Sequence, residues 1–231
     1  MRNFGSVPDE GFFDGGAKDN VELLKAWAGT TLAYALFITG VGNLLSNIGG
    51  ALQNLLIAGV VCGLGMILHE LAHRFVARRF GAQAHFLANT QMLLVSIVLA
   101  CLPIGLLFIA PGAVWHRGVI SARQGGLIAL AGPATNMVLS LLFLAIYPIL
   151  FALGLDSRLL QELCFLGVSL NASLGLFNMI PAGPFDGAKV LAWDARVFGV
   201  TVVVAIALTF GVGPNIGPIW SAIISLLIGR G

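Results

Sequence analysis

The stretch GMILHELAH, residues 65–73, lies near the end of an apolar run that begins at Ala51. Ionisable side chains are costly inside a membrane span, and they are rare there unless they serve a function. This run nevertheless contains His69, Glu70 and His73. The stretch therefore predicts a functional site carried by a helix that enters the bilayer.

The whole chain has the composition of an integral membrane protein. Of its 231 residues, 58% are hydrophobic and 10% are charged, and the mean hydropathy is +0.96. Soluble domains are nearer half apolar and a quarter charged. The net charge of +2 is small and unclustered, which excludes the basic stripe of a nucleic-acid-binding protein. We expect an all-α polytopic membrane protein whose surroundings are the lipid bilayer.

Apolar runs divide most of the chain into segments that suit membrane helices, each needing about 20 residues. Six of them are read as spans: residues 27–42, 51–76, 126–154, 159–180, 197–212 and 215–228. The last two are short and are expected to form a closing hairpin. A further run, residues 91–112, is interrupted by Pro103 and Gly105.

The basic residues indicate how these segments cross the membrane, because cytoplasmic loops are rich in Lys and Arg. If residues 91–112 enter the bilayer and return, all the basic clusters fall on one side. Those clusters are Arg74, Arg78 and Arg79, then Arg117 and Arg123, then Lys189 and Arg196. The sequence thus predicts about six transmembrane helices plus a re-entrant segment, in the cell membrane, with both termini cytoplasmic.

The N-terminal residues differ from the rest. Residues 1–25 carry five acidic side chains and lack the basic start of a signal peptide, so we expect a solvated acidic leader. Residues 26–231 are predicted to form a single membrane-embedded domain. The three cysteines, Cys62, Cys101 and Cys164, lie in apolar runs without metal-binding spacing, and they are read as small buried hydrophobes.

His69 and His73 are four residues apart, so on a helix they share a face and can bind one metal ion. With Glu70 they form H-E-x-x-H, the helix-borne zinc pair with a carboxylate base. The competing interpretation is a polar cluster at the membrane interface beside the arginines. Zinc also needs a third protein ligand and an open position for water. Two candidates are Glu162 and Asp186, of which Asp186 is preferred.

Asp186 lies in FNMIPAGPFDG, residues 177–187, directly after an apolar run. Pro181 and Pro184 cannot continue a helix, so the chain is expected to unwind there. Irregular backbone at membrane depth is tolerated only where it lines protein or water. We therefore expect Asp186 to face a polar cavity.

Three motifs, H-E-L-A-H, A-G-P-A-T-N at 131–136 and N-x-x-P-x-x-P-x-D-G at 178–187, occur in the order typical of the site-2 protease family. The chain resembles this family of intramembrane zinc metalloproteases over about residues 50–190, the catalytic core. The resemblance implies one Zn²⁺ per chain, three zinc ligands, a catalytic base and a residue that steadies the substrate or oxyanion. It also implies three residues of a motif on the helix that packs against the zinc helix. The implied zinc ligands are His69, His73 and Asp186, the catalytic base is Glu70, and the residue that steadies the substrate or oxyanion is Asn178. The three motif residues on the packing helix are Gly132, Pro133 and Asn136.

The expected function is hydrolysis of peptide bonds in or near transmembrane segments of membrane proteins, in regulated intramembrane proteolysis. A transporter or a non-catalytic zinc-binding scaffold is the alternative, but no paired broken helices are seen and the base is present. Plainer roles stay open: Asn136 as a link between helices, Asn178 as a helix cap. His85, His116 and the four tryptophans are expected at the membrane interface, and the role of Asn171 is open.

Overall fold

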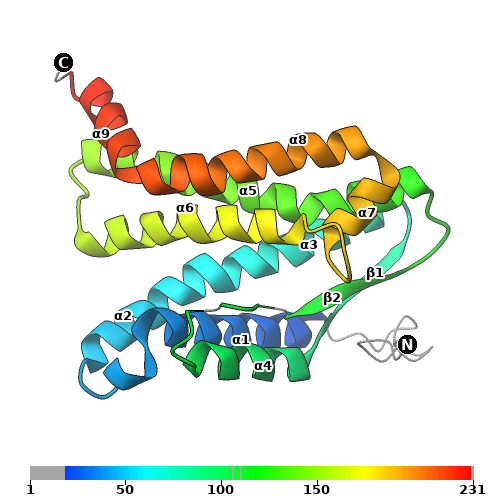
Figure 1. The fold of residues 1–231 in the computed structure, drawn as a ribbon, viewed down its shortest axis with the longest axis horizontal. Coiled ribbons are helices and arrows are strands. Elements are labelled where there is room, and N and C mark those ends of the chain that lie inside the picture. Colours follow the sequence, from blue (N-terminus) through cyan, green and yellow to red (C-terminus); the bar gives the residue numbers. More distant parts are fainter. Residues whose placement is uncertain (1–18, 106, 110, 230–231) are drawn as a thin grey trace. The chain divides into compact units, whose positions relative to one another are not determined.

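The computed structural model describes residues 19–105, 107–109 and 111–229 (Figure 1). The chain divides into two compact units, the first ending at Gln124 and the second beginning at Gly125. Apart from one two-stranded sheet, the described elements are helices. The predicted all-α class is therefore confirmed, while most of the predicted acidic leader lies outside the described residues.

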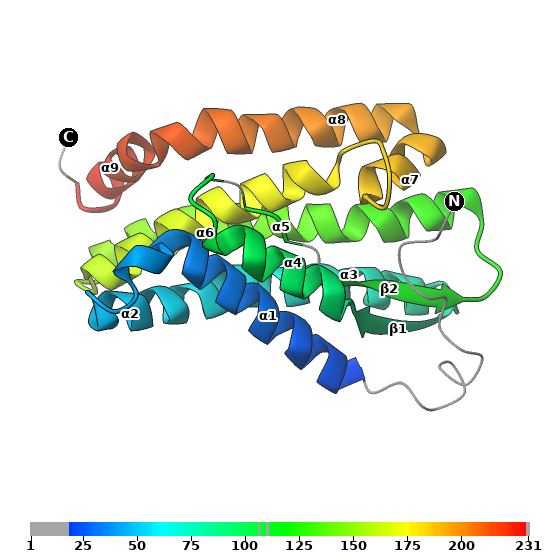
Figure 2. The same ribbon diagram turned by 60° about the horizontal axis from the view of Figure 1, so that its bottom comes forward.

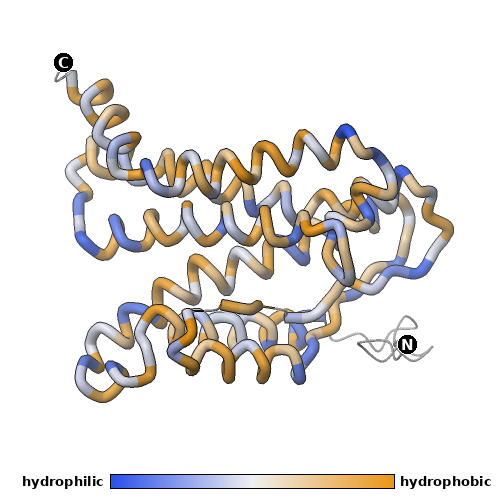
Figure 3. Tube along the Cα trace, viewed as in Figure 1, coloured by the Kyte–Doolittle hydropathy of each residue, from blue (hydrophilic) through white to orange (hydrophobic). Residues whose placement is uncertain are grey.

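Five helical segments in the described chain are long and apolar enough to cross a membrane. The shortest has 21 residues, which at 1.5 Å per residue gives about 31 Å, the thickness of the hydrocarbon core. In Figure 3 the helices are mostly orange or pale, and blue positions gather near their ends and connections. The segments are α1 (Asp19–Thr39), Ile48–Arg79, α5 (Ala122–Ala152), α6 (Arg158–Asn178) and Ala195–Leu227.

The predicted closing hairpin is wrong. The chain stays helical from Ala195 to Leu227, through α8 (Ala195–Ile206), a π turn, a 3-10 turn and α9 (Ile216–Leu227). Pro214 falls in the first turn of the short 3-10 helix, where its missing N–H is tolerated. Neither Gly211 nor Gly213 takes the positive φ that a tight reversal favours.

The number of candidate spans in the described residues is therefore five instead of six. The prediction that both termini are cytoplasmic stays a prediction.

The predicted re-entrant segment leaves from and returns to one small sheet. Strand β1 (Gln83–Ala88) pairs antiparallel with β2 (Gly112–Arg117), with Ala88 opposite Gly112. Between them lies α4 (Thr90–Cys101), which packs beside α1 (Figure 2). Its 12 residues give about 18 Å, too short to cross the membrane. The out-and-back path is thus confirmed, although Cys101 is exposed and not buried as expected.

The long segment Ile48–Arg79 is divided by a π turn. It consists of α2 (Ile48–Ala58), the turn η3 (Gly59–Gly63) and α3 (Leu64–Arg79). Helix α1 packs against this turn at its two glycines, since a Cβ on Gly63 would lie 2.5 Å from the Thr31 hydroxyl and 2.5 Å from Trp27 Cδ1. Small residues spaced four apart let membrane helices approach closely.

Substituting Gly63 with alanine is expected to weaken folding, because the added methyl group overlaps atoms of α1. Overpacking of this kind costs about 1–3 kcal/mol. The matched variant is Gly49→Ala in α2, where a Cβ would meet nothing within 4 Å. Unfolding in mixed micelles should show a loss for Gly63→Ala and none for Gly49→Ala. Equal unfolding free energies for the two variants would contradict the close packing.

In the second unit, α6 packs against α8 and the following π turn (Ala207–Val212) around a buried cluster. The short helix α7 (Asp186–Trp193) contributes Val190 to that cluster and joins α6 to α8. At the opposite end of α6, Tyr147, Cys164 and Trp220 form a second cluster. The first cluster, which also contains Met179, supports the start of the loop between α6 and α7.

Candidate active site

Helix α3 carries the predicted zinc pair on its buried side. His69, Glu70 and His73 have exposed fractions of 2%, 7% and 7%. The Nε2 atoms of the two histidines are 3.0 Å apart, and the rings meet edge to face with centroids 4.7 Å apart. The four-residue spacing therefore brings both ring nitrogens to one point, as the motif predicts.

The two histidines fit a zinc ion. Nitrogens bound to one tetrahedral zinc at about 2.0–2.1 Å lie about 3.3 Å from each other. The observed Nε2–Nε2 distance of 3.0 Å is close to this value. Two neutral imidazoles that point at each other can share only one proton, whereas a cation between them uses both lone pairs.

The C-terminal end of α3 is tied to α1 by an acidic residue that the sequence placed in a solvated leader. Asp19 Oδ2 accepts from Arg74 at 2.7 Å and from Arg78 at 3.2 Å. Its other oxygen lies 3.2 Å from His85 Nδ1 and accepts from the backbone N–H of Phe86. His85 is thus part of a structural ion cluster, consistent with the non-catalytic role expected for it.

Asp186 belongs to the second unit and is the first residue of α7. It is 7% exposed, and a carboxylate oxygen lies 3.7 Å from Nζ of the largely exposed Lys189. An ion pair this long, with one partner largely in solvent, contributes little. Like His69 and His73, Asp186 offers one ligand atom and is buried.

The turn before Asp186 is fixed by backbone contact. A Cβ on Gly187 would lie 2.3 Å from the carbonyl carbon and oxygen of Met179. Only glycine therefore fits there, and the first turn of α7 is held against the end of α6. Gly183 takes a φ of +59°, between the two prolines. The local sequence thus places Asp186 beside the turn that follows Asn178.

Glu162, the other candidate third ligand, lies in the first turns of α6 and pairs with Arg158 at 2.9 Å. Asn178, the last residue of α6, is 16 residues further on, or about 24 Å along the helix axis. Glu162 and Asp186 are therefore at opposite ends of the second unit. Glu162 has the partner and the location of an exposed helix-end ion pair.

The side chain of Asn178 donates to the Leu174 carbonyl of its own helix at 3.0 Å. This bond reaches four residues back within the helix and does not pair one of the free carbonyl groups at the helix end. An amide has two N–H groups, so one remains for another acceptor. The contact leaves both predicted roles of Asn178 open.

Asn136 and Asn171 link α5 to α6. Asn136 Nδ2 donates to Asn171 Oδ1 at 3.0 Å, and Asn171 donates to the Gly167 carbonyl at 3.0 Å, with both residues fully buried. Pro133 is buried in the same contact, where a Cβ on Gly175 would lie 3.3 Å from its carbonyl oxygen. The role of Asn171, left open by the sequence, is to pair with Asn136.

Two of the four tryptophans hold helices together, while their expected place at the membrane interface stays a prediction. Trp27 Nε1 donates to the Gly59 carbonyl at 3.0 Å, and Trp220 Nε1 donates to the Leu144 carbonyl at 2.9 Å. Trp220 is 4% exposed. Sequence reasoning missed these contacts because the paired residues lie 32 and 76 positions apart.

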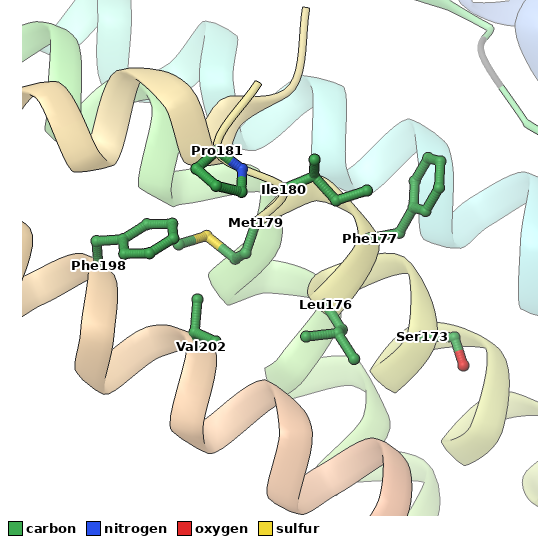
Figure 4. A pocket seen from close by; sticks show the side chains of 8 residues that line it. All are labelled: Ser173, Leu176, Phe177, Met179, Ile180, Pro181, Phe198 and Val202. Carbon is green, nitrogen blue, oxygen red and sulfur yellow. The ribbon is translucent and has the colours of Figure 1, made fainter. Parts of the chain in front are cut away.

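An apolar hollow of about 400 Å³ lies beside the turn that follows Asn178. In Figure 4, Phe198 and Val202 of α8 face Met179 and Leu176 across it. The other lining residues are Ser173, Phe177, Ile180 and Pro181. The hollow thus adjoins the chain segment between Asn178 and Asp186.

These features define a polytopic membrane protein with a buried H-E-x-x-H pair on one of its long helices. Curated relatives carry matching names. A Methanocaldococcus jannaschii protein named "Putative zinc metalloprotease MJ0611" is 39% identical over 146 residues, which are 63% of this chain and 74% of that relative. The chain therefore belongs to the site-2 protease family of zinc metalloproteases, whose members hydrolyse peptide bonds with Zn²⁺.

Two further relatives bear the same descriptive name. YwhC of Bacillus subtilis is 29% identical over 139 residues, 54% of this chain and 62% of YwhC. Rip3 of Mycobacterium tuberculosis is 30% identical over 189 residues, 71% of this chain and 42% of Rip3. The match thus covers less than two thirds of YwhC and of Rip3. No family model matches the sequence, and no solved structure matches the chain.

Proposed function

We propose that this protein is an intramembrane zinc protease that hydrolyses peptide bonds in or near transmembrane segments of other membrane proteins. One observation carries the proposal: the buried His69–Glu70–His73 group lies on Ile48–Arg79, one of the candidate spans. His69 is ten residues from Arg79, or about 15 Å along the helix axis. Chemistry at that depth acts on substrates that are themselves in the membrane.

In this proposal His69, His73 and Asp186 hold one zinc ion. The donor set supports it, because two neutral imidazoles and a carboxylate leave a fourth position for water. All three residues are buried, and a buried carboxylate is costly unless it is paired or binds a cation. When bound, zinc polarises the scissile carbonyl and lowers the pKa of its water towards about 7.

The chain's own residues would then handle protons and charge. Glu70 accepts the proton of the attacking water and passes it to the leaving nitrogen. The second N–H of Asn178 donates to the oxygen that becomes negative in the transition state. Gly132, Pro133 and Asn136 shape the α5 wall through its contact with α6 and touch no reacting atom.

The substrate must be unwound, since a helical carbonyl is already hydrogen-bonded. The sheet offers one open edge for an extended peptide. The outward groups of β1 are occupied by α1 and α3: Asp19 accepts from Phe86, Glu22 accepts from Ala88, and Arg78 donates to the Ala84 carbonyl. The outward backbone groups of Val114 and His116 on β2 have no partner among the described residues. The β2 edge is therefore the proposed substrate strand site.

The family relationship and the five candidate spans support a multi-pass protein, and we place it in the cell membrane. The Arg-bearing end of α3 is then cytoplasmic, in accord with the positive-inside rule. The expected partners are membrane proteins with a transmembrane segment.

Metal removal tests the proposal. The purified chain should contain about one zinc per molecule and should cleave members of a panel of reconstituted single-span proteins. Treatment with a chelator should abolish cleavage, and added Zn²⁺ should restore it. Fragments identified by mass spectrometry should begin within or beside the spanning segment. A zinc-loaded chain that cleaves no member of the panel, or that cleaves equally well after chelation, would contradict the proposal.

A further inference from the structure

The helix that carries the zinc pair contains a π turn directly before it. Leu64 N–H donates to the Gly59 carbonyl, five residues back, where an α-helix would use the N–H of Gly63. Such turns are rare in proteins overall, and those that occur are often found at functional sites. One inserted residue rotates everything after it by about 100° relative to everything before it. The direction in which His69 and His73 face therefore depends on where this turn is located.

Trp27 of α1 contacts the carbonyl group of Gly59, whose helical hydrogen bonding the π turn changes. The Gly59 carbonyl accepts twice, from Leu64 N–H and from Trp27 Nε1 at 3.0 Å. The indole also lies against Gly63, where a Cβ would come within 2.6 Å of Nε1. The ring thus covers both ends of the five-residue turn.

A second contact keeps α3 from rotating to compensate. At its C-terminal end, Arg74 and Arg78 bind Asp19, which is eight residues before Trp27 on the same helix α1. Helix α1 therefore holds the zinc helix at both ends. If the π turn moved, the residues between these two contacts would have to twist.

We propose that Trp27 is a positioning residue for the metal helix, because its indole N–H fixes the π turn at Gly59–Gly63 and thereby sets the rotation of His69, Glu70 and His73. Trp27 touches no reacting atom in this account. The metal-binding measurement below rests on the proposed function, whereas the role of Trp27 in fixing the position of the turn does not.

The variant Trp27→Phe keeps an aromatic ring and removes the N–H donor. Trp220→Phe is the matched control, since Trp220 makes the same indole-to-helix-carbonyl bond between α9 and α5. Each protein is titrated with Co²⁺, whose visible absorption reports ligand geometry. We expect Trp27→Phe to bind Co²⁺ about tenfold more weakly and with a changed spectrum, as variants that misalign metal ligands do. Trp220→Phe should match wild type in both, even with a similar loss of melting temperature.

Amide hydrogen exchange over residues 59–69 provides a readout that needs no metal. Trp27→Phe should accelerate exchange there, and Trp220→Phe should not. The inference is overturned if Trp27→Phe keeps the Co²⁺ affinity, the Co²⁺ absorption spectrum and the amide exchange rates of the wild type. Equal effects of the two variants on the metal readouts would also overturn it, since they would indicate general loosening. If wild type binds no Co²⁺, the proposed function fails, and the exchange measurement alone decides on Trp27.

Discussion

Glu70→Gln is expected to reduce peptide-bond hydrolysis by at least about 100-fold, because a positioned general base contributes about 10²–10⁴-fold. The amide has nearly the same size as the carboxylate but cannot accept the proton of the attacking water. Glu70 is buried beside the histidines and is not a ligand in the proposed set, so the zinc content should stay at about one per chain. Loss of activity with retained metal is the signature of a base.

The measurement compares fragment yield on the single-span panel with zinc content on the same samples. Glu162→Gln is the matched control, because it makes the same chemical change at the Arg158 ion pair near the start of α6. It should retain wild-type hydrolysis. Wild-type activity in Glu70→Gln would remove Glu70 from the mechanism. A large loss of zinc in Glu70→Gln would make it a metal ligand instead.

The spans and the zinc pair were predictable because each depends on local sequence. Runs of apolar residues indicate helices by length alone, and His69 and His73 share a helix face wherever that helix lies. The out-and-back path of residues 91–112 followed from charge, since it placed Arg117 and Arg123 on the side of Arg78. None of these inferences needed knowledge of distant contacts.

What the sequence did not reveal depends on residues far apart in the chain. The π turn at Gly59–Gly63 looks like any apolar helix segment, and its partner Trp27 lies 32 residues away. Asp19 seemed part of a solvated leader because its partners Arg74 and Arg78 are 55 and 59 residues further on. The closing hairpin was predicted because two short apolar runs, residues 197–212 and 215–228, follow each other, whereas the chain stays helical from Ala195 to Leu227.

Asp186→Ala should remove most of the bound zinc, because it leaves two protein ligands where a zinc site needs three or four. We expect the zinc content to fall from about one per chain to a small fraction and hydrolysis to be lost with it. Asp194→Ala is the matched control: Asp194 caps α8 through the N–H groups of Arg196 and Val197, and losing a cap costs about 1 kcal/mol of stability. That variant should fold less stably yet keep its zinc.

Comparing the two aspartates separates loss of a ligand from loss of fold. If both variants lose zinc in proportion to their loss of stability, Asp186 acts through folding. If Asp186→Ala keeps its zinc, the third ligand is another residue. Glu162 would be tested next, although it lies at the other end of α6 from the turn that carries Asp186. Zinc lost in Asp186→Ala and kept in Asp194→Ala would support the assignment of His69, His73 and Asp186 as the ligands of one ion.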